Sequence, residues 1–195
     1  MYELIILSLL IRGATHGYVI AGVINDVIGP FARASNSRIY PLLARLEDQG
    51  LISMHEEATS EGGRVSRAFS ITSAGRVRFR ELMLDQSSSP REYRDTFAFK
   101  VTALDQLDRE DRIQILEHYI EFARAHVRHL TREGNDLAGS TSYGHSEAQR
   151  AQFSSVFNHL VALWQREADW ATGMLDGERA ARKTTKPAQA RRSPR

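Results

Sequence analysis

The stretch Ser37–Ile52, SRIYPLLARLEDQGLI, decides the fold that this chain is expected to adopt. Its large aliphatic residues are spaced three and four apart, which predicts a helix with one buried face: Ile39, Leu42, Leu43 and Leu46. Hydroxyl, amide and basic residues are expected at the start of this helix or on its opposite side: Ser35, Asn36, Ser37, Arg38 and Arg45. If Ser37 is the cap, Pro41 falls near the first turn, where a missing N–H costs little, and Gly50 ends the helix.

The residues around this helix predict the rest of a small domain. Two helices are expected before it, over residues 2–12 and from Thr15, as the cap, to Ile28. Two strands joined by a glycine turn and a helix capped by Thr72 are expected after it; their expected bounds are 51–57, 67–71 and 72–85. This order is typical of a winged helix-turn-helix, in which the third helix enters the major groove of DNA.

The second half of the chain is predicted to be helical. Ser87–Pro90 is the clearest linker, and Asp108 can cap a long helix that Gly134 ends. The apolar residues of that helix follow a heptad pattern: Ile113, Leu116, Ile120, Ala123, Val127 and Leu130. Because such a seam needs a partner, it is expected to pack on the final helix, from about Ser146 to Leu175, or across a two-fold axis.

We therefore expect a mainly α protein with a small β-hairpin. Its predicted parts are a winged helix-turn-helix domain over 1–86, a helical, coiled-coil-like dimerisation and effector domain over 91–178, and a basic, disordered tail over 179–195.

Composition restricts the kinds of function. The 195 residues include no cysteine, which excludes disulfides, thiolate metal sites and thiol catalysis. Residues 1–84 hold nine arginines against eight acids, so a nucleic-acid site depends on where the arginines lie rather than on their excess. No apolar run is long enough to span a bilayer, and residues 4–11 do not read as a signal peptide. A cytoplasmic protein without a membrane partner is expected.

Several motifs resemble the PadR-like family of transcriptional regulators. They are GATHGY at residues 13–18, IYPLL at 39–43, GGR at 62–64 and FSITSAG at 69–75, within a match that covers about residues 3–80. The later helices resemble the longer-tailed branch of the family, whose C-terminal domain dimerises. Arg38 stands where a small or hydroxyl residue is common, and Val65 stands where the wing often has proline.

The pattern and the resemblance together give a set of expected DNA contacts. Placement at the third helix and the wing suggests Ser35, Asn36, Ser37, Arg38, Arg45, Arg64 and Arg67. The resemblance adds Tyr18 and Tyr40 near the DNA backbone, although Tyr18 could instead be a packing residue and Tyr40 could cover the edge of the core. Effectors in this family are often aromatic or amphipathic small molecules, and the expected contacts here are Phe97, Phe99, Trp164 and Trp170.

The expected function is that of a regulator and not an enzyme, because no catalytic constellation or phosphate loop is present. We expect a homodimeric repressor that binds a palindromic operator with half-sites about 34 Å apart and responds to a small molecule. No cofactor is expected. His126 and His129 have the spacing of a weak metal pair, but a solvated helix face is the preferred interpretation. The alternatives are a winged-helix adaptor that binds proteins, and a metal- or ligand-sensing module in which DNA contact is secondary.

Overall fold

The computed structural model of the protein describes residues 1–28, 36–58, 65–87, 90–139 and 146–184. Contacts divide the chain into two compact units, Met1–Leu107 and Asp108–Arg195. Helices dominate both units, and the described strands all lie in the first one. The predicted fold class, mainly α with a small β element, is confirmed.

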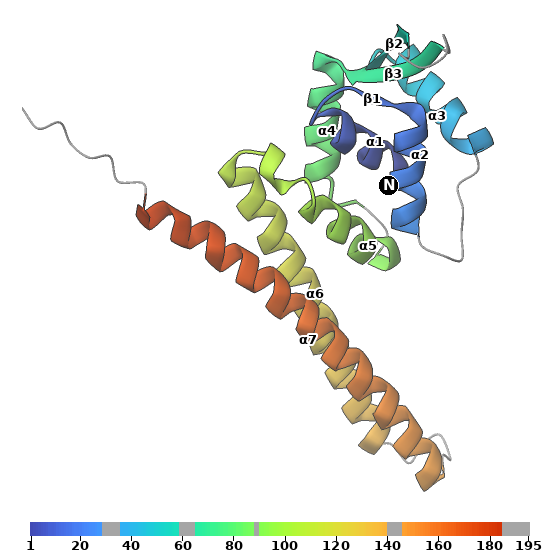
Figure 1. Ribbon diagram of the computed structural model, residues 1–195. Coiled ribbons are helices and arrows are strands. Elements are labelled where there is room, and N and C mark those ends of the chain that lie inside the picture. Colours follow the sequence, from blue (N-terminus) through green and yellow to red (C-terminus); the bar gives the residue numbers. More distant parts are fainter. Residues whose placement is uncertain (29–35, 59–64, 88–89, 140–145, 185–195) are drawn as a thin grey trace, which may run out of the picture. The chain divides into compact units, whose positions relative to one another are not determined.

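The first unit contains the predicted order of helices and strands (Figure 1). Its elements are α1 (Tyr2–Leu10), β1 (Thr15–His16), α2 (Gly17–Ile28), α3 (Asn36–Asp48), β2 (Ile52–Ala58), β3 (Val65–Ile71), α4 (Ser73–Leu84), α5 (Pro90–Val101) and the 3-10 turn η1 (Leu104–Gln106). The sheet is antiparallel with β3 in the middle, in the order β1-β3-β2.

The strand β1 was not predicted. Thr15 pairs with Phe69 and His16 with Ala68 across β3, so Thr15 is a strand residue and its expected role as the cap of α2 is wrong. A two-residue strand is too short to show the alternation by which strands are recognised in a sequence.

The core of the first unit forms where α1 and α3 bury their aliphatic residues. Leu4, Ile5, Ile6, Leu7 and Leu10 of α1 are almost completely buried, as are Ile39, Leu43 and Leu46 of α3. The apolar spacing that predicted α3 therefore identifies its buried face correctly, with Leu42 only half-buried.

Two backbone motifs fix where α3 ends and α4 begins. Gly50 has a φ of +69°, and the Leu51 N–H bonds the Leu46 carbonyl oxygen at 2.9 Å, which is the Schellman pattern of a glycine helix end. The Thr72 hydroxyl accepts the Gly75 N–H at 3.0 Å and caps α4. The same hydroxyl lies 2.7 Å from the Gly50 carbonyl oxygen, to which it can donate. Both predicted boundary residues, Gly50 and Thr72, are confirmed.

Pro41 lies deeper in α3 than expected. The helix begins at Asn36, so the proline is its sixth residue and not part of the first turn. At that position the missing N–H would have bonded the carbonyl of Ser37, and α3 therefore lacks one internal hydrogen bond.

The first unit extends beyond the predicted linker to include α5. The buried residues of α5 are spaced as one helical face: Tyr93, Thr96, Phe97 and Lys100. The Lys100 ammonium donates to the carbonyl oxygen of Asp85, the residue that follows α4, at 2.6 Å. The compact units thus divide after Leu107, whereas the sequence suggested a boundary at 87–90. The assignment of functional domains to these parts remains a prediction.

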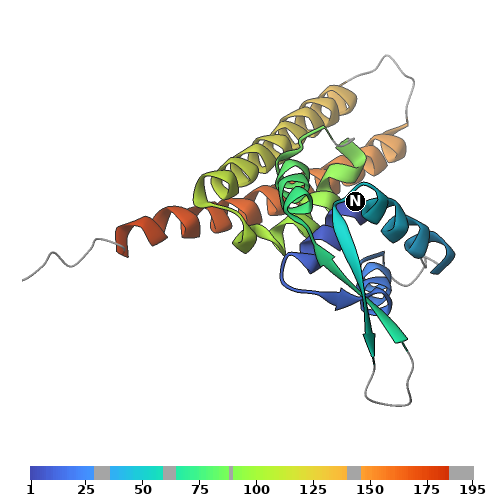
Figure 2. The same cartoon turned by 90° about the horizontal axis from the view of Figure 1, so that it is seen from above.

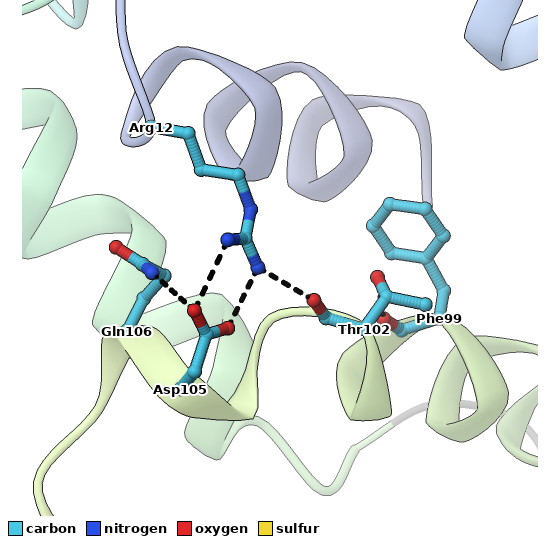
Figure 3. A network of polar contacts seen from close by, with 5 residues as sticks. All are labelled: Arg12, Phe99, Thr102, Asp105 and Gln106. Carbon is cyan, nitrogen blue, oxygen red and sulfur yellow. Dashed lines mark hydrogen bonds and ion pairs between the residues drawn. The ribbon is translucent and has the colours of Figure 1, made fainter.

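A second contact holds η1 to the end of α1 (Figure 3). The guanidinium of Arg12 donates to both carboxylate oxygens of Asp105, at 2.6 and 3.0 Å, and to the Thr102 carbonyl oxygen at 2.8 Å. The Arg12 guanidinium lowers the pKa of the Asp105 carboxyl. This two-pronged geometry is the arrangement in which arginine recognises a carboxylate most specifically.

The second unit is a pair of long helices, α6 (Arg109–Gly139) and α7 (Glu147–Thr184). They lie side by side in both views (Figure 1, Figure 2) and run antiparallel. Asp108 caps α6 as predicted, since its carboxylate accepts the Asp111 N–H at 3.0 Å. Ser146 and Gln149 form a reciprocal capping box at the start of α7.

Polar contacts fix the register of this pair. Arg112 binds both carboxylate oxygens of Glu178 at 2.9 Å, and the Tyr119 hydroxyl donates to Glu167 at 2.7 Å. Further along, the His126 ring stacks on Trp164 with 4.2 Å between centroids. The heptad residues Leu116, Ile120 and Ala123 are buried, which confirms that this seam packs on the final helix.

Two expectations about the ends of these helices are wrong. Gly134 does not end α6; it is a helical residue at which a Cβ would lie 3.1 Å from the Phe157 Cβ, so close helix packing explains the glycine. The basic tail is helical as far as Thr184, where disorder was expected from residue 179. An ion pair of 2.7 Å between Arg179 and Glu117 supports this extra length. The rest of the tail lies outside the described residues.

The close packing at Gly75 predicts a matched pair of glycine substitutions. A Cβ at Gly75 would overlap the Leu51 carbonyl oxygen, whereas a Cβ at Gly22, in the middle of α2, would meet nothing within 4 Å. We expect Gly75→Ala to lower the free energy of unfolding by about 1–3 kcal/mol. We expect Gly22→Ala to raise it by about 0.5–1 kcal/mol, because alanine is the better helix former. Denaturant titration measures both, and equal effects would contradict the packing described.

The buried amine of Lys100 predicts that stability rises with pH. Burial lowers its pKa from 10.5 to about 8, so between pH 8 and 10 the unfolded chain binds more protons than the folded one. The free energy of unfolding should therefore increase by about 1–3 kcal/mol over this range. Tyr93 acts in the opposite sense above pH 10, because burial raises its pKa to about 12.

Denaturant titrations at several pH values measure this rise. We expect it to be absent from Lys100→Met, which keeps the length of the side chain and removes the amine. An equal rise in the variant would assign the effect to other groups. In Tyr93→Phe the opposing decline above pH 10 should disappear.

Candidate nucleic-acid interface

The exposed surface of α3 has a centre and two edges. Ser37, Pro41 and Ala44 are exposed and lie opposite the buried face of the helix. Arg38 and Arg45 are seven residues apart and follow one edge, while Tyr40 lies on the other edge. The sequence predicted that the two arginines lie at the helix start or opposite its buried face. Because both instead follow one edge of the exposed face, the side chains at its centre are small.

The arginine edge of α3 borders a hollow of about 540 Å³. Its lining also includes Pro41 and Leu42 of α3 and Met1, Tyr2 and Glu3 at the chain start. Glu3 is already paired with Arg78 of α4, at 2.8 Å. Arg38 and Arg45 form no ion pair with any residue in the described part of the chain. Both guanidinium groups are exposed and can meet an anion from outside.

The other edge of α3 meets the start of α2 in an aromatic cluster. A Cβ at Gly17 would lie 3.1 Å from Tyr40 Cε1 and 3.3 Å from Phe69 Cε2, so these two rings occupy the space that glycine leaves. Tyr18, next in sequence, is 66% exposed and stacks on His16 with 5.5 Å between ring centroids. Of the predicted contacts, Tyr40 therefore lies against Gly17, the sequence neighbour of Tyr18, and both tyrosines are exposed.

The remaining predicted contacts are only partly described. Ser35 and Arg64 lie outside the described residues. Asn36 begins α3, but its side chain is likewise not among those described. Arg67 is exposed on β3, opposite Glu56 of β2.

The four expected effector contacts are divided between the two compact units. Phe97 is fully buried, so it could touch a ligand only after the core opens. Phe99 lines a hollow of about 370 Å³ together with Met1, Val27, Asp95, Ala98 and Thr102. In the second unit, Trp164 packs edge-on against Phe122 and stacks on His126. Trp170 is 43% exposed on α7.

The described part of the chain shows neither a metal-binding cluster nor a membrane-spanning helix. No group of three or more histidines, cysteines or acids there is arranged to hold a metal ion. The His126 Nδ1 lies 2.9 Å from the Phe122 carbonyl oxygen, to which it can donate. No helix among the described residues combines the length and apolar character needed to cross a bilayer.

Sequence reasoning missed two contacts in the first unit. Gly17 was read only as part of a motif, yet its missing side chain is what admits the Tyr40 ring. The contact of Arg12 with Asp105 was not predicted either, since nothing local in the sequence connects two residues 93 positions apart.

A three-helix arrangement followed by a hairpin and a further helix, with an exposed third helix, defines a winged helix-turn-helix protein. Residues 6–81 match the model of the Transcriptional regulator PadR-like family. The matched residues of the first unit thus resemble this family of transcriptional regulators.

One relative is the Negative transcriptional regulator PadR of Bacillus subtilis (strain 168). It is 26% identical over 160 residues, which cover 81% of this chain and 83% of the relative. Among solved structures, Bacillus subtilis PadR in complex with operator DNA is 20% identical, covering 89% of this chain and 96% of that one with a TM-score of 0.41. The same protein in complex with p-coumaric acid gives a TM-score of 0.39 at 20% identity, covering 91% and 94%.

Proposed function

We propose that the protein is a homodimeric repressor that binds a palindromic operator through α3 and whose affinity is modulated by a small molecule. The observation that carries the proposal is the exposed surface of α3, where Arg38 and Arg45 lie beside a small-residue centre opposite the buried face of the helix. The proposal that the protein represses transcription, rather than activates it, is supported by the relative from Bacillus subtilis, which is named a negative regulator.

DNA binding is supported by the chemistry of the two edges. Arginines can pair with phosphate or with guanine in the major groove, and tyrosine hydroxyls can bond phosphate. Glu47 and Asp48 lie at the C-terminal end of α3 and would repel phosphate. The part of the helix before these two acids, from Asn36 to Arg45, is therefore the part proposed to meet DNA. Ser35, Asn36, Ser37 and, in the wing, Arg64 and Arg67 complete the proposed contacts.

Dimerisation is supported by the incomplete burial of the second unit. Near the connection between α6 and α7, the seam residues Val127 and Leu130 are only half-buried. On α7, Phe153 is 39% and Val156 is 55% exposed. Two helices alone cannot cover these side chains, and a second copy would cover them. A two-fold dimer would also present two recognition helices to two half-sites.

Small-molecule control is supported by the hollow beside Phe99. Its lining brings Val27 of α2, Ala98 and Phe99 of α5 and the chain start together, so a ligand there would touch both the winged domain and α5. Trp170 is exposed and is a further candidate for contact with the effector. Trp164 and Phe97 would respond to a bound effector only through the side chains packed around them.

The arginine edge predicts a loss of DNA binding in two variants. Arg38→Ala and Arg45→Ala should each weaken binding to the region upstream of the protein's own gene by about 1–3 kcal/mol. Gel shifts at two salt concentrations measure the loss. Arg128→Ala, which removes an exposed arginine from α6, is the matched control and should bind normally. If Arg38 contacts a base, its variant also relaxes sequence preference; a uniform loss identifies a phosphate contact. Wild-type protein that shifts no DNA would overturn the proposal.

The exposed end of the helix pair predicts a monomeric variant. Replacing Phe153 and Val156 by serine should dissociate the dimer in sedimentation experiments. Operator affinity should then fall by about 100-fold or more, since the second half-site no longer binds as part of the same complex. Val77→Ser removes an apolar side chain that is 62% exposed on α4 and should leave both properties unchanged. A wild-type protein that sediments as a monomer while binding DNA would remove dimerisation from the proposal.

A further inference from the structure

We propose that the centre of the α3 surface recognises the 5-methyl groups of thymine, with Pro41 and Ala44 as the contacting residues. This inference rests on the proposed DNA binding and names the base feature that the middle of the helix reads.

The position of these residues follows from helix geometry and burial. Ile39, Leu43 and Leu46 are at most 1% exposed and define the direction of the core. At 100° per residue, Pro41 and Ala44 lie within about 50° of the opposite direction, between Ser37 and Asp48 on the same face. Both side chains are exposed. They are therefore the part of α3 that would lie deepest in a groove.

Between Ser37 at its N-terminal end and Asp48 at its C-terminal end, this centre is apolar. Pro41 offers a ring and Ala44 a methyl group, and Ser37, at the N-terminal end of the same face, offers the only hydroxyl there. In the major groove each base edge carries hydrogen-bonding groups, and thymine also carries a methyl group. An apolar surface pressed on an amino group or on a guanine edge would leave polar atoms without partners, which is costly. Contact with a methyl group has no such cost.

The small size of these residues matters as well. Neither side chain extends beyond three carbons, so the helix backbone can approach the floor of the groove. The long side chains, Arg38 and Arg45 on one edge and Tyr40 on the other, lie where the groove walls and phosphates would be. The centre thus selects thymine by contact, while the edges supply charge and hydrogen bonds.

The test begins with DNA that the full-length protein itself selects from random double-stranded sequences. In the preferred sequence, each thymine is replaced singly by deoxyuridine, which removes only the methyl group. We expect one or two positions in each half-site, at matching places in the two half-sites, at which affinity falls about three- to fivefold. A loss of this size corresponds to the burial of one methyl group. At the other thymines the change should stay below about twofold.

Variants assign the effect to the two residues. Ala44→Ser and Pro41→Ser place a hydroxyl where the apolar contact is proposed, and in at least one of them the penalty for deoxyuridine should shrink below about twofold. Ala74→Ser, at an exposed alanine in the first turn of α4, is the matched control and should keep the full penalty. Thermal unfolding of each variant verifies that it is folded.

The outcomes separate this inference from the function on which it depends. If the protein selects a sequence but no deoxyuridine substitution weakens binding, the thymine contact is overturned and DNA binding stands. The inference is also overturned if both serine variants keep the full penalty. If no sequence is selected at all, the proposed function fails with it.

Discussion

The position of the exposed surface of α3 depends on one hydroxyl group, that of Thr72. It accepts the Gly75 N–H at the start of α4 and lies within hydrogen-bonding distance of the carbonyl oxygens of Gly50 and Leu51, just after α3. The missing side chain of Gly75 lets the two backbone segments approach this closely. The end of α3 is therefore held to the start of another helix, which fixes the direction in which its exposed face points.

The sequence was informative where the structure is governed by local spacing. The buried face of α3, its end at Gly50 and the Thr72 cap all follow from residues within a few positions of each other, and all are confirmed. Contacts between segments that are far apart in the chain produce no such spacing pattern in the sequence. The strand β1 exists only because residues near Phe69 pair with it, and the Arg12–Asp105 contact joins residues 93 apart.

Glycine shows why the rest could not be predicted. Gly50 and Gly134 look alike in the sequence, each following a run of apolar residues at helical spacing. Gly50 ends its helix with a positive φ, whereas Gly134 continues α6 and makes room for Phe157. Only the facing helix distinguishes the two cases. The candidate site has the same limit. Spacing separated Arg38 and Arg45 from the core. It did not show that they lie along one edge of the exposed face, beside a centre of small residues between Ser37 and Ala44.

The buried amine of Lys100 also has a practical consequence. The chain contains only three lysines, and the other two, Lys183 and Lys186, stand close together near its C-terminus. Amine-reactive reagents attack exposed, unprotonated lysines, so modification of Lys100, which is 2% exposed, requires α5 to separate from its surroundings. Its rate of labelling, followed by mass spectrometry, therefore reports the opening of the first unit directly, without an introduced probe.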